Sequence, residues 1–277
     1  NNAESDELNY QTDFVGNLPL TDDLAFRVNA GYKQVGGVTD ANGLAVIGDD
    51  GAPALTGDIN SDAELYSIKD SDEADSWYVR AAFLYNFTDD VSAVLNIIHQ
   101  TDEGQGDTIG SISDNNTDIT AWEHTRRILP TAEFETDVAS LEVTADLGFA
   151  TLTSATGYAK SDQTTFTDNS GLYADLSSLY FGFPEGQTVV PTNIDQQSKS
   201  FTQELRLVSQ SEGDWDWVVG AWYRDQEQTA TFIDNYLGII PGSQTFTILL
   251  LGNILLTAGF IMTIIIHFYM GDKWRSG

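Results

Sequence analysis

The sequence predicts an all-β protein, namely an antiparallel, up-and-down portion of a transmembrane β-barrel with about eight long strands. Three observations predict it. Apolar and polar residues alternate along many segments, which is typical of strands with two different faces. These segments are about ten residues long, which is the length that a tilted strand needs to cross a bilayer. The connections between them alternate between short turns and long loops.

Each predicted strand has one apolar and one polar face. In the third, Trp77, Val79 and Phe83 fall on one face, whereas Tyr78 and Arg80 fall on the other. Alternation of this kind indicates strands rather than helices because successive strand residues point to opposite sides. In chain order, the predicted strands lie at about 9–18, 24–34, 76–87, 91–101, 136–147, 150–160, 200–209 and 215–226.

The connections differ in length and charge. Short ones are predicted at 19–23, 88–90, 148–149 and 210–214, and long ones at about 35–75, 102–135 and 161–199. The loop at 35–75 holds ten Asp or Glu residues and Lys69 as its one base. Short turns on one side and long loops on the other are the pattern of outer-membrane barrels.

The order of turns and loops also predicts an incomplete barrel. The strand at 9–18 leads into a short turn, so it descends from the outside to the periplasm. We therefore expect an ascending strand before Asn1. The strand at 215–226 ends outside, so we also expect descending chain after it. On this interpretation the sequence is an internal piece of a larger barrel.

Aromatic residues lie near both ends of the predicted strands, as expected for rings at the two membrane interfaces. The alternative is ordinary packing of aromatics in the core of a β-sandwich. The predicted interface aromatics are Trp77, Tyr85, Trp215, Trp217 and Tyr223.

Composition excludes several functions. The net charge is −30, from 42 acidic and 12 basic residues, which argues against a nucleic-acid partner. The absence of Cys excludes disulfides and thiolate chemistry. His99, His124 and His267 have no ligand-type spacing and no Ser-His-Asp pattern, so we predict neither an enzyme nor a cofactor.

Charged residues on the polar faces are predicted to point into the lumen. They could line a substrate path, but an ion network or contact with a plug is the favoured role. These candidates are Arg27, Arg80, Glu142, Asp146, Glu204, Arg206 and Arg224.

The loop segment "GDINSDAE" is a weak candidate for Ca²⁺ binding. It places oxygen ligands at every second position, Asp58, Asn60, Asp62 and Glu64. Ala63 stands where a calcium-binding EF-hand loop requires Gly, so a solvated acidic loop is the favoured interpretation.

Three hairpins resemble those of TonB-dependent receptors, in the order found in that family. They are "NYQTDFVGNLPLTDDLAFRVNAGYK", "DSWYVRAAFLYNFTDDVSAVLNI" and "SFTQELRLVSQSEGDWDWVVGAWYRDQ", and the resemblance covers about 9–232. It implies a place in the bacterial outer membrane and uptake of a scarce ligand, most often an iron–siderophore complex. TonB would act through a plug domain that this sequence lacks, and the family barrel has about 22 strands.

The segment 237–277 differs from the rest of the sequence. It follows the partial barrel predicted for 1–236, and no charged residue occurs from Asn235 to Gly271 apart from histidine. The stretch 245–270 is long enough for a membrane-spanning helix. We favour a foreign or out-of-frame C-terminus, with a genuine anchor helix or a helix inside the barrel as alternatives.

Two further functions stay open. One is an autonomous small outer-membrane barrel whose loops bind Ca²⁺ or a surface partner. The other is a soluble acidic β-sandwich that binds carbohydrate. Alternation alone does not say whether eight strands close on themselves.

Overall fold

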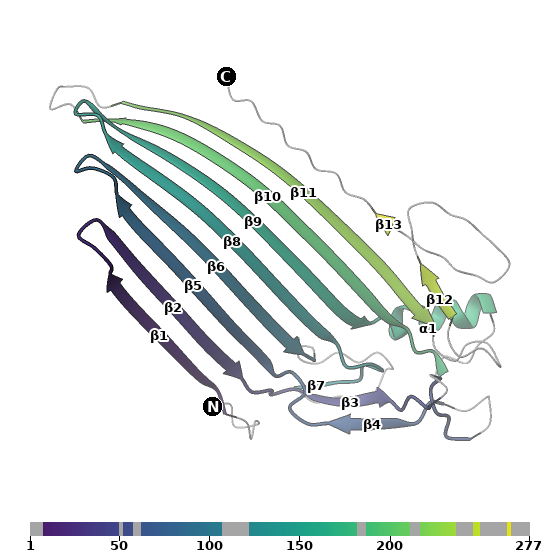
Figure 1. Cartoon of the computed structure of the whole chain (residues 1–277). Coiled ribbons are helices and arrows are strands. Elements are labelled where there is room, and N and C mark those ends of the chain that lie inside the picture. The colour runs from purple at the N-terminus through teal and green to yellow at the C-terminus, as the bar shows by residue number, and fades with distance from the viewer. Residues whose placement is uncertain are drawn as a thin grey trace.

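The computed structural model describes residues 8–49, 52–57, 62–106, 122–181, 187–210, 217–236, 246–249 and 265–266. Its main feature is one long, curved antiparallel sheet, in which sequential neighbours pair in the order β1-β2-β5-β6-β8-β9-β10-β11 (Figure 1). The strands are β1 (Tyr10–Pro19), β2 (Leu24–Val35), β5 (Ala74–Asn86), β6 (Val91–Gln105), β8 (Thr131–Asp146), β9 (Ala150–Asp168), β10 (Pro191–Ser209) and β11 (Val218–Tyr236).

The predicted all-β, up-and-down fold is confirmed, and each of the eight predicted strands is present. Their ends at the long loops extend further than predicted. β9 runs to Asp168 rather than to about 160, and β10 begins at Pro191 rather than at about 200. Beyond the apolar segment both faces of these strands are polar, so the alternation that marks a strand disappears while the backbone pairing continues.

Short turns join the strands at one end of the sheet. Two of them share the sequence Thr-Asp-Asp: the Thr21 hydroxyl accepts from the Leu24 amide at 3.0 Å, and the Thr88 hydroxyl accepts from the Val91 amide at 3.1 Å. The turn between β8 and β9 depends on Gly148, whose φ of 78° lies in the left-handed region. Local side-chain hydrogen bonds and one glycine therefore fix these three reversals.

The long connections gather at the opposite end (Figure 1). They contain a three-stranded sheet in the order β4-β3-β7, made of β3 (Asp40–Ala45), β4 (Leu65–Ile68) and β7 (Glu123–His124), and the helix α1 (Ser170–Phe181). A small buried cluster of Ala45, Ala63 and Val189, with Ile128 packed against it, also lies in these connections. None of these elements is predicted by the alternation of apolar and polar residues.

The segment after β11 is described at two places. There β12 (Phe246–Leu249) and β13 (Ile265–Ile266) both pair with β11 in antiparallel fashion. The predicted tail helix is wrong at these positions, and the rest of 245–270 lies outside the described residues. Within the described ranges, α1 included, no helix has the length and apolar character to span a membrane.

The sheet is open. β1 pairs with β2 along its whole length and, within the described residues, has no strand on its other side. The sandwich alternative needs a second sheet packed on the apolar face of the first. The described residues contain one further sheet, the small β4-β3-β7 sheet of the long connections, which lies at the end of the large sheet (Figure 1).

Candidate functional site

The strand register sorts the side chains into two faces. Val28, Ala81, Ile97 and Ala139 are directly opposite one another in successive strands, so their side chains share one face. Continued through every pair, this register defines an apolar face and a polar face. The apolar face carries the even-numbered residues of β1, β2 and β9 and the odd-numbered residues of β5, β6, β8, β10 and β11.

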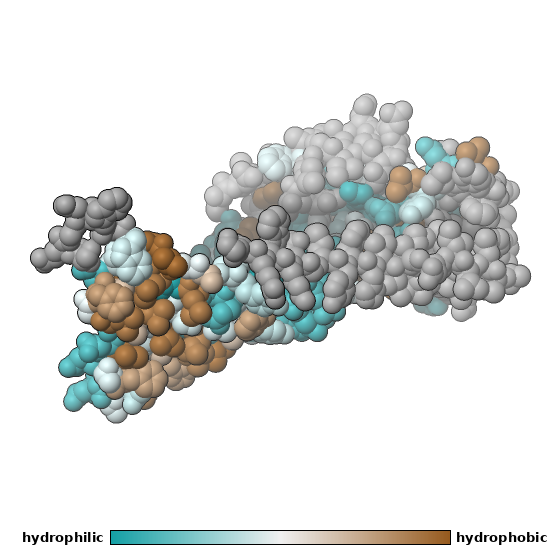
Figure 2. Space-filling model, turned by 90° about the horizontal axis from the view of Figure 1, so that it is seen from above, coloured by the Kyte–Doolittle hydropathy of each residue, from teal (hydrophilic) through white to brown (hydrophobic). Residues whose placement is uncertain are grey.

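Large hydrophobic side chains on the apolar face are exposed. Phe14 is 60% exposed, Ile97 48% and Leu205 47%, which is unusual for side chains on a continuous face. In Figure 2, hydrophobic residues gather toward the short-turn end, and hydrophilic ones follow beyond them. The large buried side chains lie instead in the connections, for example Leu44 and Val189. The sheet therefore presents apolar area that the described residues leave uncovered.

This apolar band has an abrupt border toward the long loops. On five strands an aromatic residue is followed, two positions further from the short turns, by a polar or charged one. These pairs are Tyr32 and Gln34, Trp77 and Asp75, Tyr158 and Lys160, Phe201 and Lys199, and Tyr223 and Asp225.

The border runs obliquely across the strands. Following the register from Tyr32 across six strand pairs leads to Thr229 on β11, whereas the border aromatic there is Tyr223, six residues nearer the short turns. The border thus shifts by about one residue per strand. With a rise of about 3.3 Å per residue and a strand spacing of about 4.8 Å, the strands are tilted by about 35° from the normal to this border.

The height of the band follows from the same geometry. On β2 it reaches from Leu24 to Tyr32, and on β5 from Tyr85 to Trp77. Eight residue steps along a strand tilted by about 35° give a height of about 22 Å. Outer-membrane barrels have strands tilted by about 35–45° and an apolar band about 25 Å tall.

One polar cluster interrupts the band. Gln203 on β10 donates to the Ser154 hydroxyl at 3.1 Å and accepts from the Thr156 hydroxyl at 2.6 Å. The three side chains lie on the apolar face and satisfy one another across β9 and β10. Mutual hydrogen bonding reduces the cost of polar groups in an apolar setting.

All seven predicted lumen-facing residues lie on the polar face. Arg80 donates to the Asn96 side chain at 2.8 Å, and Arg27 donates to Asn29 at 3.3 Å. Arg206 and Glu204 are 4.0 Å apart. The other three predicted residues on this polar face are Glu142, Asp146 and Arg224. The described contacts are local pairs along or between neighbouring strands rather than one connected ion network.

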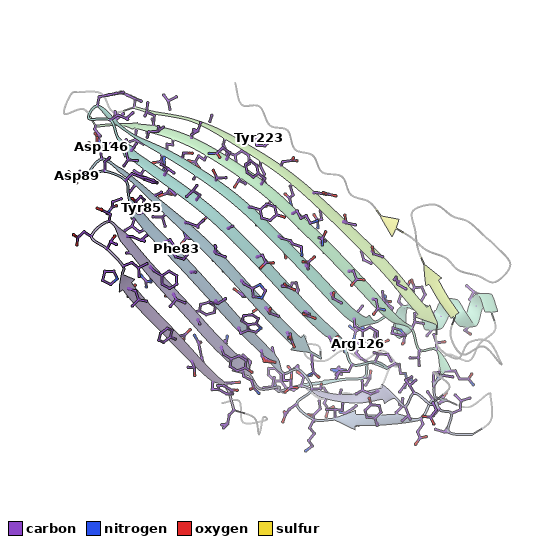
Figure 3. All side chains as sticks on the ribbon, in the orientation of Figure 1. Phe83, Tyr85, Asp89, Arg126, Asp146 and Tyr223 are labelled. Carbon is purple, nitrogen blue, oxygen red and sulfur yellow. The ribbon has the colours of Figure 1, made fainter. Side chains whose placement is uncertain are left out.

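Asp146 has a specific local role. Its carboxylate accepts from the Gly148 amide at 2.7 Å, so it stabilises the turn between β8 and β9. Figure 3 shows Asp146 and Asp89 at the short-turn end, whereas Arg126 lies at the opposite end. The alternating pattern gives no signal for this role because it marks Asp146 only as a strand residue.

The predicted interface aromatics lie on the apolar face where they are described. Trp77 and Tyr223 stand at the border toward the long loops, and Tyr85 and Trp217 stand toward the short turns. Tyr85 contacts Phe87 edge-on, with ring centroids 4.7 Å apart. Trp215 lies outside the described residues.

The weak calcium candidates do not form a described cluster. Asp58 and Asn60 lie outside the described residues. Asp62 and Glu64 are exposed, and their backbone groups bond to Thr56 and Ala54 rather than curling around a common centre. Within the described ranges, the group of side chains with metal-ligand spacing is found elsewhere.

Buried aspartates hold the long connections together. Asp168 is 1% exposed and accepts from the amides of Arg127, Ile128 and Ser170 and from the Ser170 hydroxyl. Asp72 is buried too, and it accepts from the Val38 amide at 2.5 Å. Each carboxylate thus satisfies several backbone donors from chain segments that are far apart in sequence.

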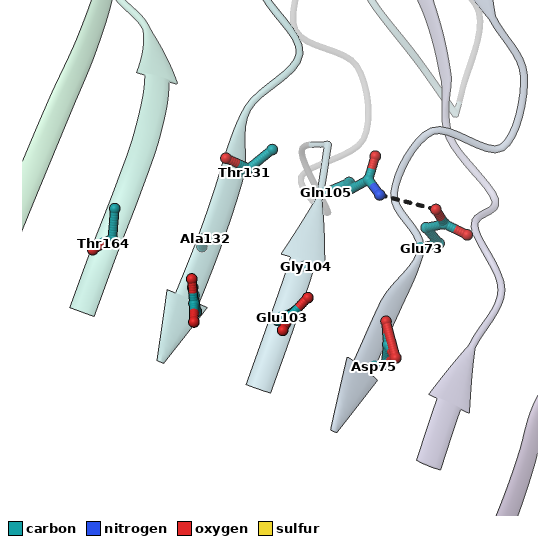
Figure 4. A pocket seen from close by; sticks show the side chains of 9 residues that line it. Glu73, Asp75, Glu103, Gly104, Gln105, Thr131, Ala132 and Thr164 are labelled. Atoms are coloured by element: carbon teal, nitrogen blue, oxygen red, sulfur yellow. Dashed lines mark hydrogen bonds between the residues drawn. The ribbon is translucent and has the colours of Figure 1, made fainter. Parts of the chain in front are cut away.

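Beyond the border, the apolar face becomes an acidic rim. A pocket of about 240 Å³ lies here, lined by Glu73, Asp75, Glu103 and Glu133 among others. Figure 4 shows Asp75 and Glu103 on the adjacent strands β5 and β6, with Gln105 donating to Glu73 at 2.9 Å. A pocket with this many carboxylates favours cations over anionic ligands.

Lys160 offsets part of this charge. Its hydrogen bond to Asp162 raises the pKa of Lys160, and the same bond, with a second from Gln197, lowers the pKa of Asp162. Both groups lie beyond the apolar band and are about one-third exposed. The pair is therefore fully charged at neutral pH.

The structure gives one histidine neighbours that spacing along the chain does not show. His99 on β6 does have ligand-type neighbours, since it lies directly opposite Asp137 and near Glu135 on β8. These residues are about forty positions apart in the sequence, so spacing along the chain gives no signal. Only the register of β6 against β8 brings them together.

Comparisons with known proteins give little support for a family. No family model matches the chain, and no curated protein matches it. Among solved structures the chain is similar to the siderophore receptor PiuA from Acinetobacter baumannii, with a TM-score of 0.29 and 13% sequence identity. The match covers 83% of this chain and 45% of that receptor, so the chain spans less than half of its length. A similarity at this level carries no argument about function.

Proposed function

We propose that the chain forms part of the wall of a bacterial outer-membrane barrel that belongs to an energy-coupled receptor. The oblique apolar band carries this proposal. It combines exposed hydrophobic side chains on one face, aromatic residues at its borders, a height of about 22 Å and a strand tilt of about 35°. These four properties are not expected together in a soluble sheet.

The rest of the sheet supports the same placement. The second face is polar and carries Arg27, Arg80 and Arg224, as expected for the side of a wall that faces water. Short turns lie at one end and long connections at the other, which matches periplasmic turns and external loops. The long connections also contain the buried aspartate contacts, so external loops would be partly ordered.

The receptor role rests on the resemblance of the three hairpins to TonB-dependent receptors. It implies that external loops and a plug bind a scarce ligand, with an iron–siderophore complex as the first candidate. TonB would supply energy through the plug. The wall contributed by this chain would hold no catalytic residues.

Cysteine scanning tests the wall directly. The chain contains no Cys, so each introduced thiol is the only one. Ile97→Cys and Ile98→Cys form a matched pair because the two residues are identical, adjacent and on opposite faces of β6. After refolding into lipid vesicles, a fluorophore attached at position 97 should be quenched by lipid-borne nitroxides. A fluorophore attached at position 98 should be quenched by an aqueous quencher instead.

Equal aqueous quenching at both positions would rule out the membrane wall and favour a soluble protein. The receptor role needs a separate measurement. Heat-modifiable migration on gels after refolding in detergent would show that the chain closes on itself and would favour the autonomous barrel. A wall that is one part of a larger receptor should not show it.

A further inference from the structure

A histidine and two carboxylates meet at the border of the apolar band. His99 on β6 and Asp137 on β8 are directly opposite each other, and Glu135 lies two residues from Asp137 on the same face. The imidazole Nδ1 is 2.7 Å from an Asp137 carboxylate oxygen. One ligand atom from each of the three residues lies within 4.8 Å of the others.

We propose that His99, Glu135 and Asp137 bind a divalent transition-metal ion, with Zn²⁺ as the best match. Imidazole nitrogen together with carboxylate oxygen suits Zn²⁺, whereas Ca²⁺ and Mg²⁺ take oxygen ligands alone. Three protein ligands leave one tetrahedral position for water. The site is thus of the open type rather than a closed structural centre.

The geometry requires small adjustments. Ligand atoms about 2.0–2.1 Å from a tetrahedral ion are about 3.3 Å apart. The contact between His99 and Asp137 is somewhat shorter than this, and the widest separation among the three ligand atoms is at most 4.8 Å. Rotation of the two carboxylate groups alone is enough to bring these separations close to the tetrahedral value. The backbone can stay fixed because all three residues lie in paired strands.

Trp77 holds the imidazole from the other side. Its ring centroid is 4.8 Å from that of His99, and Trp77 belongs to the neighbouring strand β5. A ring that is already packed has less rotational freedom to lose when it binds an ion. The side chains of His99 and Asp137 are 29% and 46% exposed, so an ion can reach them from solvent.

One cation competes for the same carboxylates. Lys160 on β9 lies directly opposite Asp137, and both Glu135 and Asp137 act on it electrostatically. Its hydrogen-bond partner is Asp162, however, rather than either proposed ligand. Glu103 and Glu133 on the same face add negative charge beyond the site. Removing the Lys160 charge should therefore strengthen binding of a metal ion.

The experiment uses the full chain in zwitterionic detergent and titrates it with Zn²⁺ by calorimetry. Co²⁺ serves as a spectroscopic probe, because its visible absorption reports nitrogen and oxygen ligation. Cu²⁺ serves as a quencher of the adjacent Trp77. The test variants are His99→Gln, Asp137→Asn and Lys160→Gln. Glu133→Gln is the matched control, since this carboxylate shares the strand and the face but lies outside the triad.

We expect about one bound Zn²⁺ per chain, and a loss of affinity of about 10- to 100-fold or more in His99→Gln and Asp137→Asn. Lys160→Gln should bind severalfold more tightly, and Glu133→Gln should stay close to the unmodified protein. If His99 and Asp137 form a structural hydrogen bond and no metal site, Lys160→Gln should leave the metal affinity unchanged. Unchanged Zn²⁺ affinity in His99→Gln, or equal affinity for Ca²⁺, would overturn the proposal.

The Lys160→Gln variant also separates a loss of metal ligands from a loss of folding. A ligand variant that loses binding through unfolding would lose its thermal transition too. A gain of affinity in Lys160→Gln cannot arise in that way. The metal site does not depend on the proposed function, because binding in detergent is measured without any bilayer or siderophore.

Discussion

Tyr32 on β2 and Tyr223 on β11 stand at the same border of the apolar band, although the strand register offsets them by six residues. A sheet that packs against protein does not require its apolar border to shift steadily in one direction across the strands. Such a shift is expected for a sheet whose strands cross a layer of fixed thickness at an angle. The relationship is therefore what the proposed membrane wall predicts.

A charge in the middle of the band tests this explanation. Ala81 and Ala82 on β5 are adjacent, of equal size and on opposite faces. In lipid vesicles, Ala81→Arg should destabilise the protein by about 2–4 kcal/mol, because an arginine near the bilayer midplane loses its hydration. Ala82→Arg is the control and should cost far less. Urea unfolding followed by tryptophan fluorescence gives both values, and equal costs would contradict a lipid-facing band.

The turn between β8 and β9 predicts a backbone effect. Gly148 has a φ of 78°, and a Cβ at this position would meet nothing within 4 Å. Gly148→Ala should therefore cost about 1–2 kcal/mol through conformation alone. Gly148→Asn should recover part of this loss, since Asn tolerates the left-handed region. Thermal unfolding of both variants, with Gly104→Ala as a control outside that region, measures the effect.

The edge strand β1 is held by a contact that passes over a glycine. Tyr78 on β5 donates to the Asp13 carboxylate on β1 at 3.0 Å, and a Cβ on the intervening Gly31 would lie 2.3 Å from the Tyr78 ring. Gly31→Ala must push the ring away, and Tyr78→Phe removes the hydrogen bond.

Each of these two substitutions should weaken β1 by about 1 kcal/mol. Combined, they should cost less than the sum because both break the same contact. Hydrogen exchange of the amides at 10–19 measures the loss locally. Full additivity in the double variant would show that Gly31→Ala does not act through the hydrogen bond between Tyr78 and Asp13.

Asp168 predicts a local loosening of the long connections. Replacing this buried carboxylate by Asn removes the charge that accepts from the Arg127 and Ser170 amides, at a cost of about 1.5–3 kcal/mol. Hydrogen exchange should rise at 122–130 and at 187–190, while β5 and β6 stay protected. Asp89→Asn at an exposed short turn is the control and should change neither region.

The sequence predicted the strands well wherever one face had to be apolar. β5 illustrates this, since alternation from Trp77 to Tyr85 marks it clearly. The outer part of β9, "SDQTTFTD", has no such alternation and its sequence predicts a loop, yet its backbone continues to pair with β8 and β10. Strand pairing there is propagated from the apolar segment rather than specified by local pattern.

The elements of the long connections were missed for a different reason. α1 shows no clear amphipathic pattern, and its beginning is set by the Asp168 carboxylate, which accepts from the Ser170 amide. The metal triad was missed because His99 and Asp137 become neighbours only through the register. Contacts between distant segments of the chain lie outside what local periodicity can predict.

The oblique border determines which strand could pair with the open edge of β1. A sheet that shifts by about one residue for each strand has a shear number close to its strand count, which is a geometry that closes into a cylinder. Any strand that pairs with Tyr10–Pro19, from this chain or another, must match its alternation of apolar and polar side chains as well as its hydrogen-bonding groups. A partner strand shifted by a single residue would turn its apolar side chains to the polar face of the sheet.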